Sequence, residues 1–470
     1  MNELTITLVQ GNGKPLYEQI YEYLKNEIRE GSLPSDERLP STRALAKHLQ
    51  VSRNTVDLAY DQLVSEGYIE AVPYKGYYVS HIEELYQLSD QQIIEPVCGQ
   101  QSAKKIRYDF QPDGIELNAF PYNAWRKITK NTLIDDKKEL FMLGSPMGEW
   151  SFRVTIARYL HQARGVNCTP EQIIVGAGND YLLLLLGKIL GENQVIAMEN
   201  PTYKQAYKGF ISMGYEVRTV GMDEYGMDVE DLECTGANIA YVMPSHQYPL
   251  GTVMPIKRRL ELLKWALEKP GRYIIEDDYD SEFRYKGKPI PALQGNDGND
   301  TVIYIGTFSK SIAPAIRVSY MVLPPKLLEQ YQEKALFYTS TVSRIDQTIL
   351  NVFITEGYYE RHLNRMRAIY KSKHDVLLVE MKKLSSVCKV YGENAGLHIL
   401  AEFHNGMTEE QLIRLAAEQG ITVYGISQAY IAESKKKMYP TLILGYATIS
   451  EQDIKEAVSI LEKVWIPQKQ

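Results

Sequence analysis

Residues 301–320 read TVIYIGTFSKSIAPAIRVSY, an apolar run followed by a group of polar side chains. The run TVIYIG has the uninterrupted apolar character of a buried parallel strand. Ser309 and Lys310 follow it closely, and Arg317 comes seven residues after Lys310. A hydroxyl, an amine and a guanidinium near one strand end suit an anionic ligand, although a lone lysine is usually a solvated surface charge. The stretch therefore predicts an α/β fold and one candidate site.

Three other apolar runs repeat this pattern between helical stretches: QVIAM (194–198), IAYVM (239–243) and RYIIE (272–276). Strands that alternate with helices predict a parallel sheet covered by helices. We expect one large α/β domain over residues 108–470, mostly helical with a few strands from about residue 338.

Two further segments place polar groups at predicted strand ends. In IIVGAGNDYLLLLL (173–186) a strand enters a glycine turn and then a helix, which directs backbone N–H groups toward an anion. In YIIEDDYDSEF (273–283) a strand ends at Asp277 and Asp278, and Tyr279 follows. Each signal alone is weak, because glycine turns and acidic strand ends are common in α/β proteins.

Together these groups match the needs of pyridoxal phosphate. That cofactor takes a lysine amine for a Schiff base, a carboxylate at its pyridine nitrogen, and N–H and cationic donors at its phosphate. Tyr203, in ENPTY (199–203) after the strand QVIAM, could stack on the flat ring. A scaffold that binds no phosphate and has incidental polar strand ends is the alternative.

Residues 1–80 form a separate α+β unit in this interpretation. Apolar residues at helical spacing predict a helix that ends near Gly31, and Ser41 and Ser52 can cap two further helices joined by a tight turn. The segment YIEAVPYKGYYV (68–79) alternates β-forming residues around a turn, as a hairpin does. We therefore expect a winged helix-turn-helix.

The charge balance bears on nucleic-acid binding. The chain has 52 Lys plus Arg against 59 Asp plus Glu, a net charge of −7, which excludes a polycation that coats nucleic acid non-specifically. Residues 38–55 contain four basic residues and no carboxylate. This edge could meet DNA phosphates while the start of the third helix meets base edges. A packing or dimerisation module is the alternative.

Other features concern location and organisation. The acidic start MNELTITL is unlike a signal peptide, and Gly187 and Lys188 interrupt the most apolar run, so we expect a cytoplasmic protein without membrane contact.

Polar, glutamine-rich residues 81–107 predict a linker. Widely spaced cysteines predict neither disulfides nor a metal site; they are Cys98, Cys168, Cys234 and Cys388.

The run LPSTRALAKHLQVSRNTVDLAYDQLVSEGYIEAVPYKGYYV (39–79) resembles the winged helix-turn-helix of GntR-type bacterial transcription regulators. The resemblance covers residues 15–80 and implies binding to double-stranded operator DNA. The implied DNA contacts are Arg43, Ser52, Arg53, Asn54 and Thr55, with Lys75 and Gly76 in the wing. Asp57 departs from the pattern, because many relatives have an arginine there that contacts DNA.

The order of the segments over residues 108–465 resembles that of fold-type I aminotransferases. The whole chain resembles the MocR/GabR-type regulators. The resemblance is closest to the GabR branch in the motifs IIEDDYDSEF, PSHQYPLGT and GTFSKS. This resemblance implies that Lys310 forms the Schiff base, Asp277 pairs with the pyridine nitrogen, and Tyr279 donates to the ring hydroxyl. Tyr203 would stack on the ring. The implied phosphate ligands are Arg317, Ser309, Thr307, Gly178 and Asn179. Tyr248 stands where ordinary aminotransferases have an asparagine.

The effector site departs from both groups of relatives. No arginine follows Arg414, whereas aminotransferases hold the substrate carboxylate with an arginine near the C-terminus. Gln205 and Gln428 stand where GabR-type relatives have two arginines that hold an amino-acid effector. An amide cannot neutralise a carboxylate, so we expect an effector other than γ-aminobutyrate. Lys435, Lys436 and Lys437 could supply charge, or form a solvated loop.

These observations predict a homodimeric regulator that senses a small amino compound as an external aldimine. Its dimerisation is implied by the fold-type I resemblance and does not follow from the residues themselves. Two alternatives remain open: a working aminotransferase with a fused DNA-binding unit, and a regulator that senses pyridoxal phosphate itself.

Overall fold

A computed structural model describes residues 14–81, 106–134, 138–285, 290–392, 395–433 and 439–466, together with positions 6, 8 and 9. The chain divides into two compact units, residues 1–101 and 102–470. Nearly all of the predicted linker, together with Cys98 and the lysines at 435–437, lies outside the described residues.

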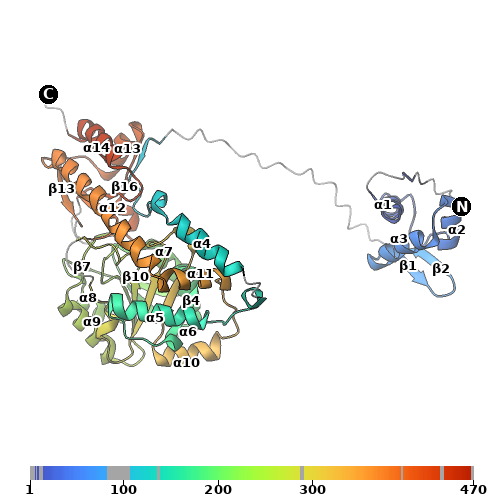
Figure 1. Cartoon of the computed structure of the whole chain (residues 1–470), viewed down its shortest axis with the longest axis horizontal. Helices are drawn as coiled ribbons and strands as arrows, with labels where there is room; N and C mark the ends of the chain where they lie inside the picture. Colours follow the sequence, from blue (N-terminus) through green and yellow to red (C-terminus); the bar gives the residue numbers. More distant parts are fainter. Residues whose placement is uncertain are drawn as a thin grey trace. The chain divides into compact units, whose positions relative to one another are not determined.

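The first unit is the predicted winged helix-turn-helix (Figure 1). It comprises α1 (Leu16–Arg29), α2 (Thr42–Leu49), α3 (Arg53–Ser65) and the antiparallel hairpin of β1 (Ile69–Val72) and β2 (Gly76–Val79). Ser41 and Ser52 cap α2 and α3 as expected, each hydroxyl accepting a backbone N–H three residues on. The buried apolar residues of the three helices and the hairpin form one small core, and this packing fixes the orientation of α3 within the unit.

The second unit is built on a seven-stranded sheet in the order β4-β12-β11-β10-β9-β5-β6. Four of its strands are the predicted apolar runs: β5 (Val195–Glu199), β9 (Ile239–Val242), β10 (Tyr273–Asp278) and β11 (Val302–Thr307). These strands and β6 (Glu216–Val220) run parallel. Only β12 (Ser319–Val322) pairs antiparallel within this sheet, with β11 and with β4 (Ile173–Gly176). The carboxyl ends of β10 and β11 therefore lie side by side.

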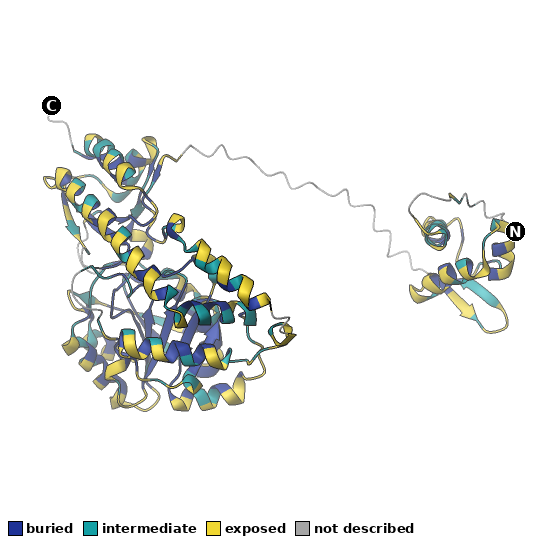
Figure 2. Cartoon of the chain, viewed as in Figure 1, coloured by how far each residue is buried: buried dark blue, intermediate teal, exposed yellow. Residues whose placement is uncertain are grey.

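Helices enclose this sheet (Figure 1) and bury its strands (Figure 2), except for the edge strand β6, of which only Val220 is buried. They are α4 (Tyr122–Leu133), α5 (Trp150–Arg164), α6 (Asn179–Leu190), α7 (Lys204–Ser212), α8 (Val229–Thr235), α9 (Ile256–Glu268), α10 (Pro325–Lys334) and α11 (Arg344–Thr355). Separate apolar clusters form on the two faces of the sheet because a fully buried parallel strand presents apolar residues to both. Two short strand pairs flank the domain: β15 (Ile421–Thr422) with β3 (Tyr108–Asp109), and β7 (Met222–Asp223) with β8 (Gly226–Met227).

The C-terminal part combines helices and strands, as expected. A four-stranded sheet has the order β13 (Cys388–Tyr391), β14 (His398–Phe403), β17 (Thr441–Gly445) and β16 (Tyr424–Gly425). The long helix α12 (Tyr358–Met381) packs on α14 (Glu451–Trp465), and α13 (Glu409–Glu418) lies against α14. Short 3-10 turns connect many of these elements. They are η2 (Leu117–Ala119), η3 (Lys138–Phe141), η4 (Pro170–Gln172), η5 (Gln294–Asn296), η6 (Pro314–Ile316), η7 (Lys382–Leu384) and η8 (Ile426–Ala429).

Across the described ranges, no helix is both long and apolar enough to span a membrane. Over the same ranges, no group of three or more histidine, cysteine or acidic residues is arranged to hold a metal ion.

Candidate functional site

A cavity of about 320 Å³ opens at the carboxyl ends of β10 and β11. Residues far apart in the sequence converge on it because the sheet order brings the end of β4 and the start of α6 toward the ends of these strands. The cavity is lined by nine of the predicted residues: Asn179, Tyr203, Gln205, Asp277, Tyr279, Thr307, Ser309, Lys310 and Arg317. Asp113, Asp180, Met243, Tyr248 and Pro314 complete the lining.

The start of α6 provides an anion cradle. Gly178 has φ +92°, and a Cβ there would lie 2.3 Å from Arg317 Nη2, so only glycine lets this guanidinium approach the helix start. Backbone N–H groups and the positive helix end add to its charge. Ser309 Oγ and Asn179 Oδ1 are buried without a hydrogen-bond partner among the described residues. The Ser309 hydroxyl can donate to an anion and, beside the cationic cradle, fits a phosphate group, whereas Asn179 Oδ1 only accepts hydrogen bonds and would not contact one.

Asp277 is a buried carboxylate at the end of β10. The Tyr241 hydroxyl donates to its Oδ2, and Asn179 Nδ2 donates to its Oδ1 at 3.3 Å. Burial raises the pKa of Asp277 to about 7, opposed by the bond from Tyr241 and reinforced by the charge of Asp278. A cationic partner such as a protonated pyridine nitrogen would stabilise its ionised form. Tyr241 was not among the residues predicted from the sequence. The apolar pattern of a buried strand does not indicate which of its side chains donates to a residue on the neighbouring strand.

Lys310 is already paired. Its Nζ donates to Asp113 Oδ1 and to the Asp113 carbonyl oxygen, both at 2.9 Å. Arg317 Nη2 donates to Asp180 Oδ2 at 3.0 Å. These two carboxylates were not predicted from the sequence. Asp113 comes from the segment before η2, whose approach to Lys310 depends on tertiary packing alone.

Tyr279 is positioned by a buried hydrogen-bonded chain. Its hydroxyl lies 2.9 Å from His246 Nδ1, which lies 2.9 Å from Asp280 Oδ2. A Cβ at Gly396 would lie 2.0 Å from the His246 ring, so a glycine is needed there. The chain fixes the Tyr279 hydroxyl at the cavity wall. Tyr248 contacts Tyr279 and Tyr203 edge to face, with ring centroids 6.3 and 6.1 Å apart.

The two predicted effector residues are placed differently. Gln205 is exposed on α7 and lines the cavity. Gln428 is exposed on η8 and is not among the residues that line this cavity. The structure therefore brings only Gln205 to the Lys310 site.

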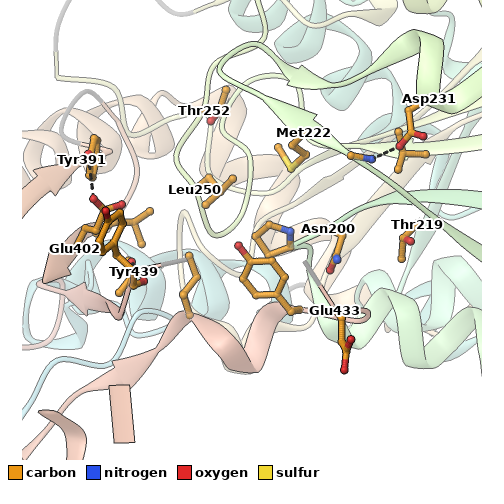
Figure 3. Close-up of a pocket in the computed structure, with 17 residues that line it drawn as sticks. Asn200, Thr219, Met222, Asp231, Leu250, Thr252, Tyr391, Glu402, Glu433 and Tyr439 are labelled. Atoms are coloured by element: carbon orange, nitrogen blue, oxygen red, sulfur yellow. Dashed lines mark hydrogen bonds between the residues drawn. The ribbon is translucent and has the colours of Figure 1, made fainter. Parts of the chain in front are cut away.

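A second cavity of about 510 Å³ contains none of the predicted site residues (Figure 3). It is bounded by the loops after β5 and β6 and by the C-terminal sheet, and it includes the carboxylates of Asp231, Glu402 and Glu433. Asp231 already accepts a hydrogen bond from the Gly221 N–H, and Glu402 accepts one from Tyr391. None of its described lining residues is a lysine or an arginine, so it does not suit a phosphate.

The burial of Glu199 predicts that the stability of the second unit depends on pH. It is fully buried at the end of β5, and burial raises its pKa to about 8, although contacts with Gln247 and Met227 oppose the shift. Between about pH 4.5 and 8 the folded state keeps a proton that the unfolded state has lost, so this group lowers the free energy of unfolding as pH rises. As the pH rises from 5 to 8, we expect the free energy of unfolding of Glu199→Gln to increase by about 1 kcal/mol or more relative to that of wild type. Urea unfolding at both pH values measures this difference; an offset that does not vary with pH would contradict it.

The predicted DNA contacts lie on the first unit. Arg43, Ser52, Arg53, Asn54 and Lys75 are exposed, and Thr55 and Gly76 are half-buried. Gly76, the first residue of β2 directly after the hairpin turn, has φ +114°. Asp57, which departs from the pattern, has its Oδ2 3.4 Å from Arg53 Nε, one helical turn away. The two side chains form an ion pair on the exposed face of α3. Arg38, one of the four basic residues of the predicted phosphate-facing edge, has its guanidinium beside Gly76 and so adds a cation at the wing.

Comparisons with known proteins agree with this two-part organisation. Residues 16–79 match the family model for bacterial regulatory proteins of the gntR family, and residues 113–461 match that for aminotransferase class I and II. The uncharacterized HTH-type transcriptional regulator YdeL of Bacillus subtilis (strain 168) is 39% identical over 96% of this chain and 97% of its own length. The probable rhizopine catabolism regulatory protein MocR of Rhizobium meliloti is 32% identical over 96% of this chain and 94% of its own. A multiple substrate aminotransferase from Thermococcus profundus shares the fold of the second unit, with a TM-score of 0.68, 23% identity and coverage of 77% of this chain and 91% of its own.

Proposed function

Because the chain belongs to the MocR-type transcription regulators, in which a gntR-family helix-turn-helix is joined to a class I and II aminotransferase domain, we propose that it regulates transcription by sensing a small amino compound with bound pyridoxal phosphate. The observation that carries this proposal is one cavity that is lined by Lys310, Asp277 and Arg317; Gly178 is not among its lining residues but lies against the Arg317 guanidinium. These groups stand at the ends of different elements, and a phosphate-free scaffold would have no need to bring them together.

The residues present fit the cofactor. Lys310 would hold its aldehyde carbon, Asp277 its pyridine nitrogen, and Tyr279 its ring hydroxyl. Tyr203 would cover the ring, and the phosphate would lie among Arg317, Ser309, Thr307, Gly178 and Asn179. When bound, pyridoxal phosphate supplies an electrophilic carbon at which a lysine and a primary amine can exchange. Asp113 and Asp180 would give up their present cationic partners to it.

Regulation requires that the amino compound bind one arrangement of the protein better than another. A homodimer, located in the cytoplasm with its operator, would present two winged units to a two-part DNA site. A relationship closest to the GabR branch stays a prediction, as does the participation of Gln205 and Gln428 in effector binding.

The test follows the visible spectrum and DNA binding together. The holo-protein is titrated with a panel of amines and amino acids, and its affinity for a duplex selected from a random pool is measured by fluorescence anisotropy. We expect one compound to change both signals with the same midpoint. Multiple turnovers of amino transfer would instead support a working aminotransferase. A change in DNA affinity on adding the cofactor to apo-protein, without any amine, would support a sensor of pyridoxal phosphate.

Arg53 and Asp57 provide a paired prediction for the DNA contact. Arg53→Ala is expected to weaken binding to the selected duplex by about tenfold or more, since one arginine contact is worth about 1–3 kcal/mol. Asp57→Asn is expected to strengthen binding, because it removes the carboxylate 3.4 Å from the Arg53 guanidinium. Anisotropy titrations at several salt concentrations measure both, and equal affinities for the two variants would contradict an Arg53 contact.

A further inference from the structure

His246 and Asp280 form a buried pair behind the wall of the Lys310 cavity. Each residue is 3% exposed, and His246 Nδ1 lies 2.9 and 3.1 Å from the two carboxylate oxygens of Asp280. An ionised carboxylate only accepts hydrogen bonds, so the imidazole carries a hydrogen on Nδ1 whether the ring is neutral or charged. Arg164 and Arg284 line a small gap together with this pair, so cations stand near the carboxylate as well.

The same ring nitrogen faces the Tyr279 hydroxyl at 2.9 Å. A nitrogen that carries a hydrogen has no lone pair left, so Tyr279 can accept from it but cannot donate to it. Burial raises the pKa of Tyr279 well above its ordinary value, and the charge of Asp280 adds to this shift, so the hydroxyl keeps its own hydrogen. His246 is its only hydrogen-bond partner among the described residues. Because Tyr279 lines the cavity, its hydrogen is available to a ligand there.

The other edge of the imidazole offers no second partner among the described residues. Nε2 is buried and unpaired there. A Cβ at Gly251 would lie 3.4 Å from Nε2 and a Cβ at Gly396 would lie 2.7 Å from it, so glycine backbone covers this edge. The His398 ring, 5.6 Å away between centroids, is neutral, because burial and the charge of His246 lower its pKa to about 4. The Asp280 carboxylate therefore decides which nitrogen of His246 carries the hydrogen.

We propose that the His246–Asp280 pair sets the direction of the Tyr279 hydroxyl: the hydrogen held on His246 Nδ1 makes the hydroxyl donate into the cavity, toward the ring oxygen of the cofactor. The inference rests on the proposed function, because the acceptor belongs to the cofactor. His246 and Asp280 are positioning residues, since neither is among the described residues that line the cavity.

The visible absorption band of the lysine-bound cofactor reports this donation. Raising the pH removes the proton at the lysine nitrogen and leaves more negative charge on the ring oxygen. A hydroxyl that donates to this oxygen favours the deprotonated form, and so lowers the pH at which half of the band is lost. We expect Tyr279→Phe to raise this midpoint by about one pH unit or more, because a hydrogen bond to a charged group is lost.

Asp280→Asn changes the chemistry of the pair and keeps its shape. An amide can donate to His246 Nδ1, so the hydrogen is expected to move to Nε2 and Nδ1 to accept from Tyr279. The midpoint should then rise by about half a pH unit or more. Loss of the negative charge alone acts in the opposite direction, because a nearby carboxylate favours the protonated form. In Tyr279→Phe, where only the charge effect remains, Asp280→Asn should therefore not raise the midpoint.

Nitrogen NMR of histidine-labelled protein locates the hydrogen directly, in the apo- and the holo-protein. We expect it on Nδ1 of His246 in wild type and on Nε2 in Asp280→Asn, the signal being identified by its absence from His246→Gln. Asp375→Asn is the matched control. Asp375 Oδ1 lies 3.0 Å from His374 Nδ1, and neither residue lines the cavity, so this variant should leave the midpoint unchanged.

The outcomes distinguish this inference from the proposed function. It is overturned by a wild-type His246 without a hydrogen on Nδ1, by a hydrogen that stays there in Asp280→Asn, or by an Asp280→Asn effect that is the same with and without the Tyr279 hydroxyl. Amine sensing stands in each of these cases. A holo-protein whose spectrum responds to no amine would overturn the proposed function, while NMR of the apo-protein would still locate the hydrogen.

Discussion

Lys310→Ala is expected to abolish every effect of amines on DNA binding while leaving the DNA affinity of the winged unit intact. The substitution removes the only described lysine of the cavity, so the cofactor loses its covalent attachment and the amine loses the group with which it would exchange. Asp113 loses its ammonium partner as well. The two units have separate cores, which is why the defect should stay within the second.

The measurement combines the absorption spectrum with anisotropy titrations on the selected duplex. The variant should lack the visible band of a lysine-bound cofactor, and its DNA affinity should stay constant across the amine panel. Lys334→Ala is the matched control, because this lysine lies outside the cavity and contacts the Ile189 carbonyl. An amine response that survives in Lys310→Ala would refute the sensing role of the cavity.

Arg164→Met is expected to cost the second unit about 3–5 kcal/mol of unfolding free energy, because it leaves a buried charge without its partner. Arg164 and Asp278 are 3% and 2% exposed, and Arg164 Nε lies 2.8 Å from Asp278 Oδ2. The same guanidinium donates to Ser245 Oγ at 2.6 Å. This network connects α5 to the end of β10, directly after Asp277.

Urea unfolding of the apo-protein, followed by fluorescence, measures the loss. Lys264→Met serves as the control: its ion pair with Glu268 is exposed and 4.0 Å long, and should contribute less than about 1 kcal/mol. The double variant Arg164→Met/Asp278→Asn should recover part of the loss, because it removes the orphaned charge. No recovery would show that lost packing, and not the charge, causes the instability.

The sequence predicted the elements that local chemistry determines. The apolar runs became β5, β9, β10 and β11, since a strand buried on both faces must be apolar throughout. Ser41 and Ser52 became helix caps, since a hydroxyl at that position satisfies a free N–H. Polar groups at predicted strand ends met in one cavity, because parallel strands end at the same edge.

Tertiary structure decided the partners of those groups. Asp113, Tyr241 and His246 contact site residues from distant segments, and their surrounding sequence carries no periodic signal for these contacts. Gln205 and Gln428 were paired from the resemblance, but only Gln205 lines the cavity, because α7 faces the site and η8 leaves Gln428 exposed.

Residue type and spacing alone thus determined which chemical groups this chain offers and on which kind of element each one stands, since capping, burial and alternation act between neighbours. The charge that surrounds the Lys310 amine was decided by folding. It depends on a carboxylate 197 positions from Lys310 in the chain, brought within 2.9 Å by packing against the C-terminal part of the domain. Such a contact arises from the summed packing of many elements, and no local rule specifies it.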